Sequence, residues 1–174
     1  FDLWCQILKR VPRSRILIHA MAGEYLRATL DRFEQSGVAR DRVEVVGKQE
    51  WQPYIHTYHR IDISLDTFPY NGGITTCDNL VMGVPVITLS GQTPVGRGGR
   101  SILCNIGLPE LVAYSPDEYV KLAVGLAGDL PRLRELRKSL RRRMQASPLM
   151  NAPRFARNVE AAYREAWRRW CAKP

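Results

Sequence analysis

The fold is decided by the stretch Leu65-Asp66-Thr67-Phe68-Pro69-Tyr70-Asn71-Gly72-Gly73-Ile74-Thr75-Thr76-Cys77-Asp78. At its start, Ile61, Ile63 and Leu65 alternate with polar residues, which predicts a buried strand over residues 61–66. The Pro, Asn and Gly residues that follow predict a turn, and this turn opens a helix over residues 75–82. A strand that runs through a turn into a helix is typical of α/β domains.

The turn and the start of the helix have the outline of a site for a nucleotide diphosphate. Gly72 and Gly73 let the backbone approach a ligand closely, because neither carries a Cβ. Thr75 and Thr76 place hydroxyl groups on the first helical turn, where unpaired N–H groups and the helix dipole favour an anion. Asp78 follows within a turn and is placed to accept hydrogen bonds from a ribose diol. The alternative for the two glycines is a plain tight turn.

Strands and helices alternate along the chain, which predicts a Rossmann-like α/β fold with a parallel sheet covered by helices on both faces. Ligands of such sheets bind beyond the carboxyl ends of the strands, where the loop 66–75 falls. We expect strands at residues 15–19, 42–46, 61–66, 85–89 and 110–112. We expect helices at residues 3–10, 24–36, 54–59, 75–82, 100–106, 116–127, 131–145 and 153–171.

The composition indicates one globular domain with a core of its own, because 45% of the 174 residues are hydrophobic. The four cysteines are widely spaced, which favours a reduced cytoplasmic setting and argues against a zinc site or a disulfide framework. We find no signal peptide and no apolar run near the ~20 residues of a membrane helix. The chain begins at Phe1 inside an amphipathic pattern, so we expect a fragment of a larger protein.

The net charge of +9 raises the possibility of nucleic-acid binding. Much of the excess, however, lies in residues 131–145 and 153–171, where arginines interleave with apolar residues at helical spacing. This pattern predicts two helices that each have a solvated face opposite a packed one. Docking to a missing part of the protein or to an acidic partner is the other interpretation. The apolar positions are Leu133, Leu136 and Leu140, then Phe155, Val159, Tyr163, Trp167 and Trp170.

The central motif LDTFPYNGG-TTCD is similar to the donor-binding core of the O-linked N-acetylglucosamine transferase/SPINDLY family. The similarity continues through residues 82–91, 101–103 and 106–113, and through residues 147–150 to the end. It covers most of the chain, and the bacterial members, which carry helical repeats ahead of a catalytic region, are the nearest type.

The resemblance implies that residues 1–174 are the C-terminal, nucleotide-sugar-binding half of a GT-B glycosyltransferase. In that architecture the final helix, here about residues 153–171, crosses back to the N-terminal half. Trp167 and Trp170 would then pack on that half, or they pack within this domain. The implied reaction transfers a sugar, N-acetylglucosamine from UDP-GlcNAc, to Ser or Thr hydroxyls of a protein acceptor, without a metal ion or other cofactor. The implied catalytic residues lie upstream of Phe1, so we expect the isolated chain to be inactive.

The resemblance also implies the residues that bind the donor. Backbone amides of Gly73, Ile74 and Thr75 would contact the diphosphate, and Asp78 would take the ribose hydroxyls. The full set of implied donor-binding residues is Gln49, Tyr54, Asn71, Gly72, Gly73, Ile74, Thr75, Thr76, Asp78 and Arg97.

Four positions depart from the family pattern. Ile74 stands where a threonine is common, and Gly73 stands where the animal enzymes have a histidine. A lysine and a histidine of the animal enzymes, near the base and ribose, align with Trp51 and Tyr54. Either aromatic ring would stack on the base or belong to the core, and Gln49 would offer backbone groups to the base edge. The base of the donor nucleotide is therefore left open between uracil and guanine, since SPINDLY-type relatives can use a GDP-sugar such as GDP-fucose.

A second glycine-rich segment, residues 91–101, also lies between an expected strand and an expected helix, and it contains Arg97. It does not match the GxGxxG dinucleotide fingerprint, so we expect a flexible loop that borders the donor. The histidines, His19, His56 and His59, have no Ser or Cys partner at a spacing that indicates a hydrolase triad. Two other functions stay open: a catalytically degenerate nucleotide-sugar-binding or regulatory domain, and a basic nucleic-acid-binding module.

Overall fold

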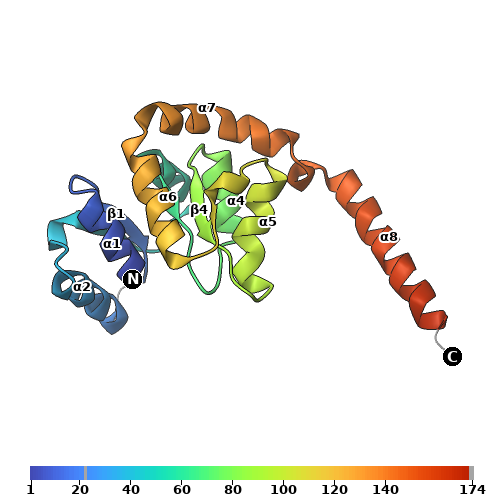
Figure 1. Cartoon of the computed structure of the whole chain (residues 1–174), viewed down its shortest axis with the longest axis horizontal. Coiled ribbons are helices and arrows are strands. Elements are labelled where there is room, and N and C mark those ends of the chain that lie inside the picture. The colour runs from blue at the N-terminus through green and yellow to red at the C-terminus, as the bar shows by residue number, and fades with distance from the viewer. Residues whose placement is uncertain (22, 173–174) are drawn as a thin grey trace.

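The computed structural model describes residues 1–21 and 23–172, in which helices alternate with strands (Figure 1). The helices are α1 (Asp2–Arg10), α2 (Glu24–Gln35), α3 (Trp51–Thr57), α4 (Ile74–Val81), α5 (Gly98–Asn105), α6 (Pro116–Gly128), α7 (Leu130–Ala146) and α8 (Ala152–Cys171). The strands are β1 (Ile16–His19), β2 (Val43–Val46), β3 (Ser64–Leu65), β4 (Val86–Leu89) and β5 (Val112–Ala113). Short 3₁₀ turns cover Arg40–Arg42, Tyr58–Arg60, Val95–Arg97, Pro109–Leu111 and Pro148–Met150.

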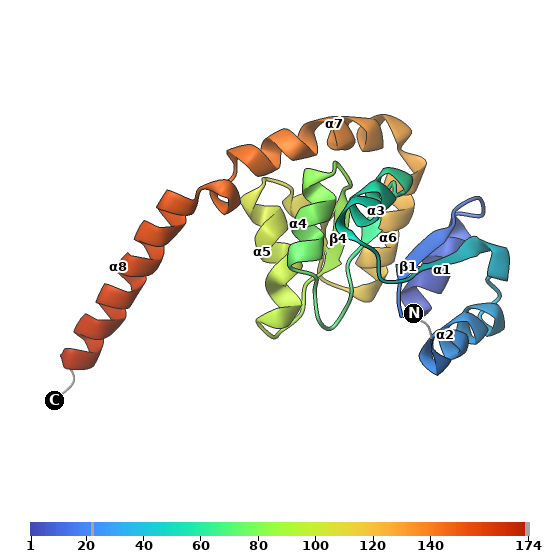
Figure 2. The same cartoon turned by 180° about the vertical axis from the view of Figure 1, so that it is seen from behind.

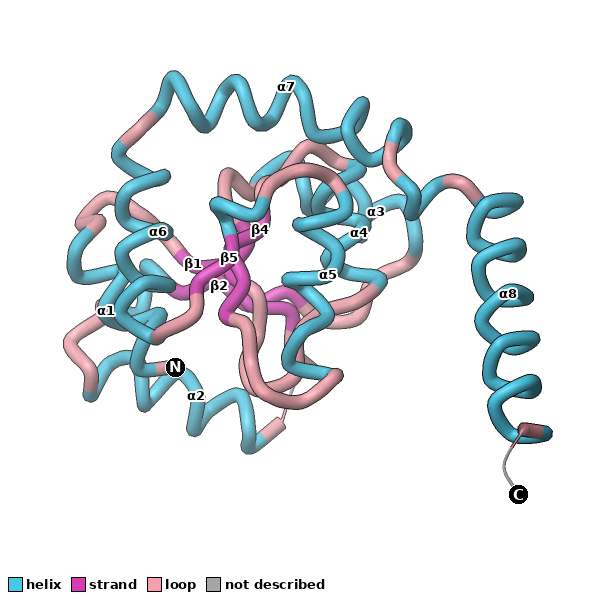
Figure 3. The backbone as a smooth tube through the Cα atoms, turned by 45° about the vertical axis from the view of Figure 1, so that its right-hand side comes forward, coloured by secondary structure: helices cyan, strands magenta, loops and turns pink. Residues whose placement is uncertain are grey.

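All the strand pairs described are parallel, as the alternation of strands and helices predicted. β1 pairs with β2, and a second sheet has the order β3-β4-β5. The tube view in Figure 3 shows the strands at the centre and the helices outside them. Every residue of the central strand β4 is buried, as expected for a strand covered on both faces. The predicted α/β class is confirmed.

Two apolar clusters hold the elements together. The larger cluster joins β4 and β5 to α4, α5, α6 and α7, and its fully buried members include Leu80, Ile87, Leu103 and Leu140. The smaller cluster packs α1 and α2 against β2, with Phe33 fully buried at its centre. Contacts between α1 and α6 join the two regions.

The prediction of a packed face opposite a solvated face is confirmed for α7. Leu133, Leu136 and Leu140 are buried, whereas the arginines of this helix other than Arg137 are exposed. Asp129 caps this helix, because its Oδ1 accepts a hydrogen bond from the backbone N–H of Arg132 at 3.0 Å. The charge of α7 is therefore mainly that of a solvated surface.

The same prediction is wrong for α8 within this chain. Figures 1 and 2 show α8 extending away from the rest of the molecule. Its aromatic residues Phe155, Tyr163, Trp167 and Trp170 are all exposed, so the alternative that the two tryptophans pack within this domain is also wrong. The amphipathic pattern was correct, but within residues 1–21 and 23–172 the side chains of Phe155, Tyr163 and Trp167 are left exposed.

Two strands are shorter than predicted. Only Ser64–Leu65 of residues 61–66 pairs with β4, and the guanidinium of Arg137 donates to the carbonyl oxygens of Ile61 and Asp62 at 2.6 and 3.3 Å. Those carbonyls are satisfied by a side chain in place of a neighbouring strand. Most of the strand expected at residues 110–112 is a 3₁₀ turn, and pairing begins at Val112.

No helix in residues 1–21 or 23–172 combines the length and apolar composition needed to cross a membrane.

Candidate functional site

The loop between β3 and α4 lies at the carboxyl end of the sheet. Gly73 is the N-cap of α4, and within the described residues no side chain caps the helix. Gly73, Ile74 and Thr75 are exposed, so their N–H groups lie at a solvent-facing helix N-terminus. Such a terminus carries partial positive charge and favours an anion. The structure therefore brings together the three residues that were expected to contact the diphosphate.

Beneath this loop lies Asp66, a residue that the sequence reasoning assigned only to a strand. It is 7% exposed, and its Oδ1 accepts a hydrogen bond from the N–H of Gly72 at 2.7 Å. Its Oδ2 accepts from the hydroxyl of Thr88 on β4 at 2.6 Å. Burial raises the pKa of Asp66, and the hydrogen bonds from Thr88 and Gly72 offset part of that rise. Asp66 thus fixes the turn, and the Gly72 N–H is not open to a ligand.

Asn71 ties the loop to the second glycine-rich segment. Its Nδ2 donates to the carbonyl of Thr67 at 2.9 Å, and its Oδ1 accepts from the N–H of Gly99 at 3.4 Å. The backbone N–H of Asn71 also donates to the carbonyl of Val95 at 3.1 Å. Asn71 is 3% exposed, so it braces the loop from below and does not face a ligand.

The two threonines of the first helical turn differ in exposure. Thr75 is exposed beside the open amides, whereas Thr76 is 2% exposed. A Cβ on Gly72 would lie 2.6 Å from Oγ1 of Thr76 and 2.9 Å from Oγ1 of Thr75, so only glycine fits there without displacement. The hydroxyl of Thr76 therefore packs under the turn, and that of Thr75 stands at its edge.

Asp78 of α4 is joined to α3 by a chain of hydroxyl groups. The phenol of Tyr54 donates to Oδ2 of Asp78 at 2.9 Å, and the phenols of Tyr54 and Tyr58 lie 2.5 Å apart. The ring of Tyr54 makes edge contacts with Tyr58 and His19, at centroid distances of 5.2 and 6.4 Å. Burial raises the pKa of Tyr54.

The other residues expected near the base lie around α3. Trp51 is 67% exposed, and its ring lies 6.0 Å from that of Tyr54 in a tilted arrangement. The side-chain oxygen of Gln49 accepts from the hydroxyl of Thr57 at 3.0 Å. Figure 2 shows α3 and α4 on the same side of the molecule.

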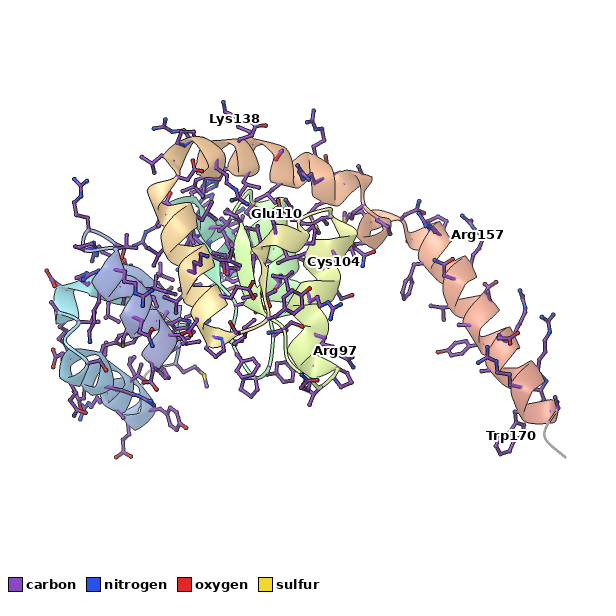
Figure 4. The ribbon with its side chains drawn as sticks, in the orientation of Figure 1. Arg97, Cys104, Glu110, Lys138, Arg157 and Trp170 are labelled. Atoms are coloured by element: carbon purple, nitrogen blue, oxygen red, sulfur yellow. The ribbon has the colours of Figure 1, made fainter. Side chains whose placement is uncertain are left out.

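Arg97 ends the 3₁₀ turn that precedes α5. Its side chain is exposed, and Figure 4 shows it at the end of α5 that lies away from α7. The next residue, Gly98, faces the loop between β3 and α4, because a Cβ on Gly98 would lie 3.6 Å from the carbonyl oxygen of Gly72. The second glycine-rich segment therefore borders the first. It is not wholly flexible, since Gly96 and Gly99 are buried.

An apolar cavity of about 400 Å³ lies on the other side of Asp78, among α3, α4, the end of α7 and the turn that follows it. Burial raises the pKa of the Cys77 thiol in its wall, and the charge of Asp78 adds to the rise. The residues lining the cavity are Trp51, Ile55, Cys77, Asp78, Val81, Met82, Met144, Leu149 and Met150.

His56 and His59 are exposed, and their rings lie 6.1 Å apart. Within the described residues, no group of three or more His, Cys, Asp or Glu side chains is arranged to hold a metal ion.

Comparison with known proteins gives one consistent result. The model of the family described as Glycosyl transferase family 41 matches residues 1–159. The chain is 40% identical over 174 residues to the probable UDP-N-acetylglucosamine–peptide N-acetylglucosaminyltransferase SPINDLY of Arabidopsis thaliana. It is 34% identical to the probable enzyme of the same activity named SEC from that plant. These matches cover 98% of this chain but only 19% and 18% of the two relatives.

Among solved structures, a mutant of the Thermobaculum terrenum O-GlcNAc transferase matches with a TM-score of 0.91 and 38% sequence identity. The match covers 98% of this chain and 33% of that one. The Rossmann-like α/β fold of a GT-B glycosyltransferase is thereby confirmed.

Proposed function

The chain belongs to glycosyl transferase family 41, and on this premise we propose that it is the donor-binding half of a glycosyltransferase. The observation that supports the proposal most is the pairing of an uncapped, exposed helix N-terminus at Gly73–Thr75 with the carboxylate of Asp78 one turn later. A nucleotide diphosphate needs both features, because its phosphates are anionic and its ribose carries a diol.

The residues have separate roles in this proposal. The backbone N–H groups of Gly73, Ile74 and Thr75 bind the diphosphate, and Arg97 adds positive charge from the bordering segment. Asp66 and Asn71 position the turn and do not touch the donor, since both are buried and hydrogen-bonded beneath it.

The chemistry that this arrangement supports is departure of a nucleotide diphosphate. Negative charge grows on the diphosphate as the sugar leaves, and prealigned N–H groups stabilise that charge without reorganisation. In our proposal these amides and Arg97 carry the stabilisation, and the mechanism uses no metal ion or other cofactor.

We assign UDP-GlcNAc as the donor and Ser or Thr hydroxyls of a protein as the acceptor. The support is that the relatives matched at 40% and 34% identity are described as probable UDP-N-acetylglucosamine–peptide transferases. Because the chain spans about a fifth of their length, the acceptor site and the catalytic base belong to the rest of the protein in this proposal, and we expect the chain alone to be inactive.

The exposed helix α8 is assigned to the contact with that remaining part. Its side chains Phe155, Tyr163 and Trp167 are exposed in the part of the chain that the structure describes, and Figure 4 shows Trp170 at its far end, well away from the sheet. An exposed apolar stripe along a helix is typical of an interaction surface.

Calorimetric titration of the chain with UDP, GDP and NAD tests the proposal. We expect saturable binding of UDP or GDP, and we expect Asp78→Ala to weaken it by about 1–3 kcal/mol, because charge-assisted hydrogen bonds to the ribose are lost. Asp62→Ala is the matched control, since Asp62 is an exposed carboxylate outside the site. Binding of NAD alone, or salt-dependent binding of nucleic acid without competition by UDP, would overturn the proposal.

A further inference from the structure

The carboxylate of Asp78 is not an isolated group on α4, because Tyr54 holds one of its oxygens and Tyr58 in turn holds the hydroxyl of Tyr54. The phenol of Tyr54 donates to Oδ2 at 2.9 Å. A phenol has a single proton, so the short contact between the two phenols must be a hydrogen bond from Tyr58 to Tyr54. The direction of the chain is therefore fixed: Tyr58 donates to Tyr54, and Tyr54 donates to Asp78.

The tyrosine pair is itself rigid. Tyr58 is 6% exposed, and burial of its phenol would be unfavourable without the hydrogen bond to Tyr54. The ring of Tyr54 meets those of Tyr58 and His19 edge-on, at interplanar angles of 85° in both cases, and Trp51 lies against it at 37°. These contacts fix the position from which the hydroxyl of Tyr54 reaches Asp78.

We propose that Tyr54 and Tyr58 are positioning residues that orient the Asp78 carboxylate to recognise the cis-diol of a ribose, so that the site selects ribonucleotides over deoxyribonucleotides. This inference rests on the proposed function, and it gives Tyr54 a role different from stacking on the base. A carboxylate offers about four lone-pair positions, of which Tyr54 takes one. Oδ1 and the rest of Oδ2 remain for the two hydroxyls of the diol.

The physical benefit is preorganisation. The carboxylate of a partly exposed aspartate rotates about the bond between Cβ and Cγ. A ligand that binds only one orientation of the carboxylate must stop this rotation, which costs affinity. The hydrogen bond from Tyr54 applies that restraint before the ligand arrives. Loss of the hydroxyl should therefore reduce affinity only for ligands that use the carboxylate.

The test compares a ribonucleotide with its analogue lacking the diol. Affinities of UDP, or of GDP if the chain prefers it, and of the matching 2′,3′-dideoxy diphosphate are measured for the unsubstituted chain and for Tyr54→Phe. We expect Tyr54→Phe to weaken binding of the ribonucleotide about threefold to tenfold, the usual effect of one hydrogen bond, and to leave the dideoxy analogue unchanged. Tyr58→Phe should have the same selectivity with a smaller effect, because Tyr54 can still donate to Asp78.

Tyr25→Phe is the matched control, since this tyrosine is exposed on α2 and its removed hydroxyl lies outside the site. Thermal unfolding of each variant confirms that it is folded. Equal weakening of both nucleotides by Tyr54→Phe would show a general packing role and overturn the inference. The inference would also be overturned if Asp78→Ala weakened ribonucleotide binding and Tyr54→Phe left it unchanged. The proposed function would still stand in that case. If the unsubstituted chain binds neither UDP nor GDP, the proposed function and this inference fall together.

Discussion

Gly99→Ala tests whether Asp66 and Thr88 are packed directly under the second glycine-rich segment. A Cβ at this position would lie 2.3 Å from Oδ2 of Asp66 and 2.3 Å from Oγ1 of Thr88. Both atoms belong to buried residues that are hydrogen-bonded to each other at 2.6 Å. The methyl group therefore cannot enter without separating them or displacing the start of α5.

The size of the effect follows from three contributions. Overpacking a well-packed core costs typically about 1–3 kcal/mol. Loss of the hydrogen bond from Thr88 to the carboxylate of Asp66 costs roughly 1.5–3 kcal/mol, because one partner is charged. The gain in helix propensity from Gly to Ala is at most about 1 kcal/mol, and it is smaller at a helix end. We expect Gly99→Ala to lower the free energy of unfolding by about 1.5–6 kcal/mol.

Denaturant unfolding followed by circular dichroism measures this change, with Gly125→Ala as the matched control. Gly125 lies inside α6, is exposed, and has no atom within 4 Å of a built Cβ. Alanine there should raise the free energy of unfolding by about 0.5–1 kcal/mol. If Gly99→Ala were as stable as the unsubstituted chain, the packing of Asp66 and Thr88 described above would be wrong.

Thr75→Val should weaken UDP binding by less than Asp78→Ala in calorimetry, because the backbone N–H survives; an equal loss would show that the hydroxyl carries the contact. The raised pKa of Asp66 means that the folded chain holds its proton to higher pH than the unfolded chain, so stability falls as pH rises from about 4 through that raised value. In Asp66→Asn the free energy of unfolding should no longer fall over this pH range. If it still falls, another group causes the pH dependence. Leu140→Ala should cost about 2–5 kcal/mol in denaturant unfolding, because Leu140 is fully buried. Trp167→Ala should change stability by less than about 0.5 kcal/mol, and a large loss would mean that α8 packs within the chain.

The alternation of strands and helices, and the position of the loop at the carboxyl end of the sheet, could be predicted because they depend on local patterns. The Pro, Asn and Gly residues of the turn located the start of α4 within one residue, and two adjacent glycines indicated the open turn before it. These signals lie within one short segment of sequence, so no knowledge of distant contacts was needed.

The support beneath the loop could not be predicted in the same way. Asp66 looks like an ordinary polar residue at the end of a strand, and only its contact with Thr88, 22 residues later, shows that it is buried. For Tyr54 the sequence left stacking on the base and a place in the core both open, and its hydrogen bond to Asp78 joins residues 24 apart. Long-range contacts of this kind leave no trace in local periodicity.

The exposed face of α8 has a different cause. The spacing of Phe155, Tyr163 and Trp167 correctly predicts an amphipathic helix, but periodicity does not say what the apolar face contacts. Among the described residues these three side chains are exposed, and the chain covers only 33% of the matched solved structure.

The most direct test of the central claim is to observe the backbone amides while UDP is added, in two-dimensional ¹H–¹⁵N NMR spectra of the chain. If the diphosphate binds at the N-terminus of α4, the largest shift changes will be at Gly73, Ile74 and Thr75, followed by Asp78. The distant Gly125 in α6 should not change. Largest changes elsewhere, for example at Arg13, Arg15 and Arg42, would contradict the account, and so would the absence of any change at saturating UDP.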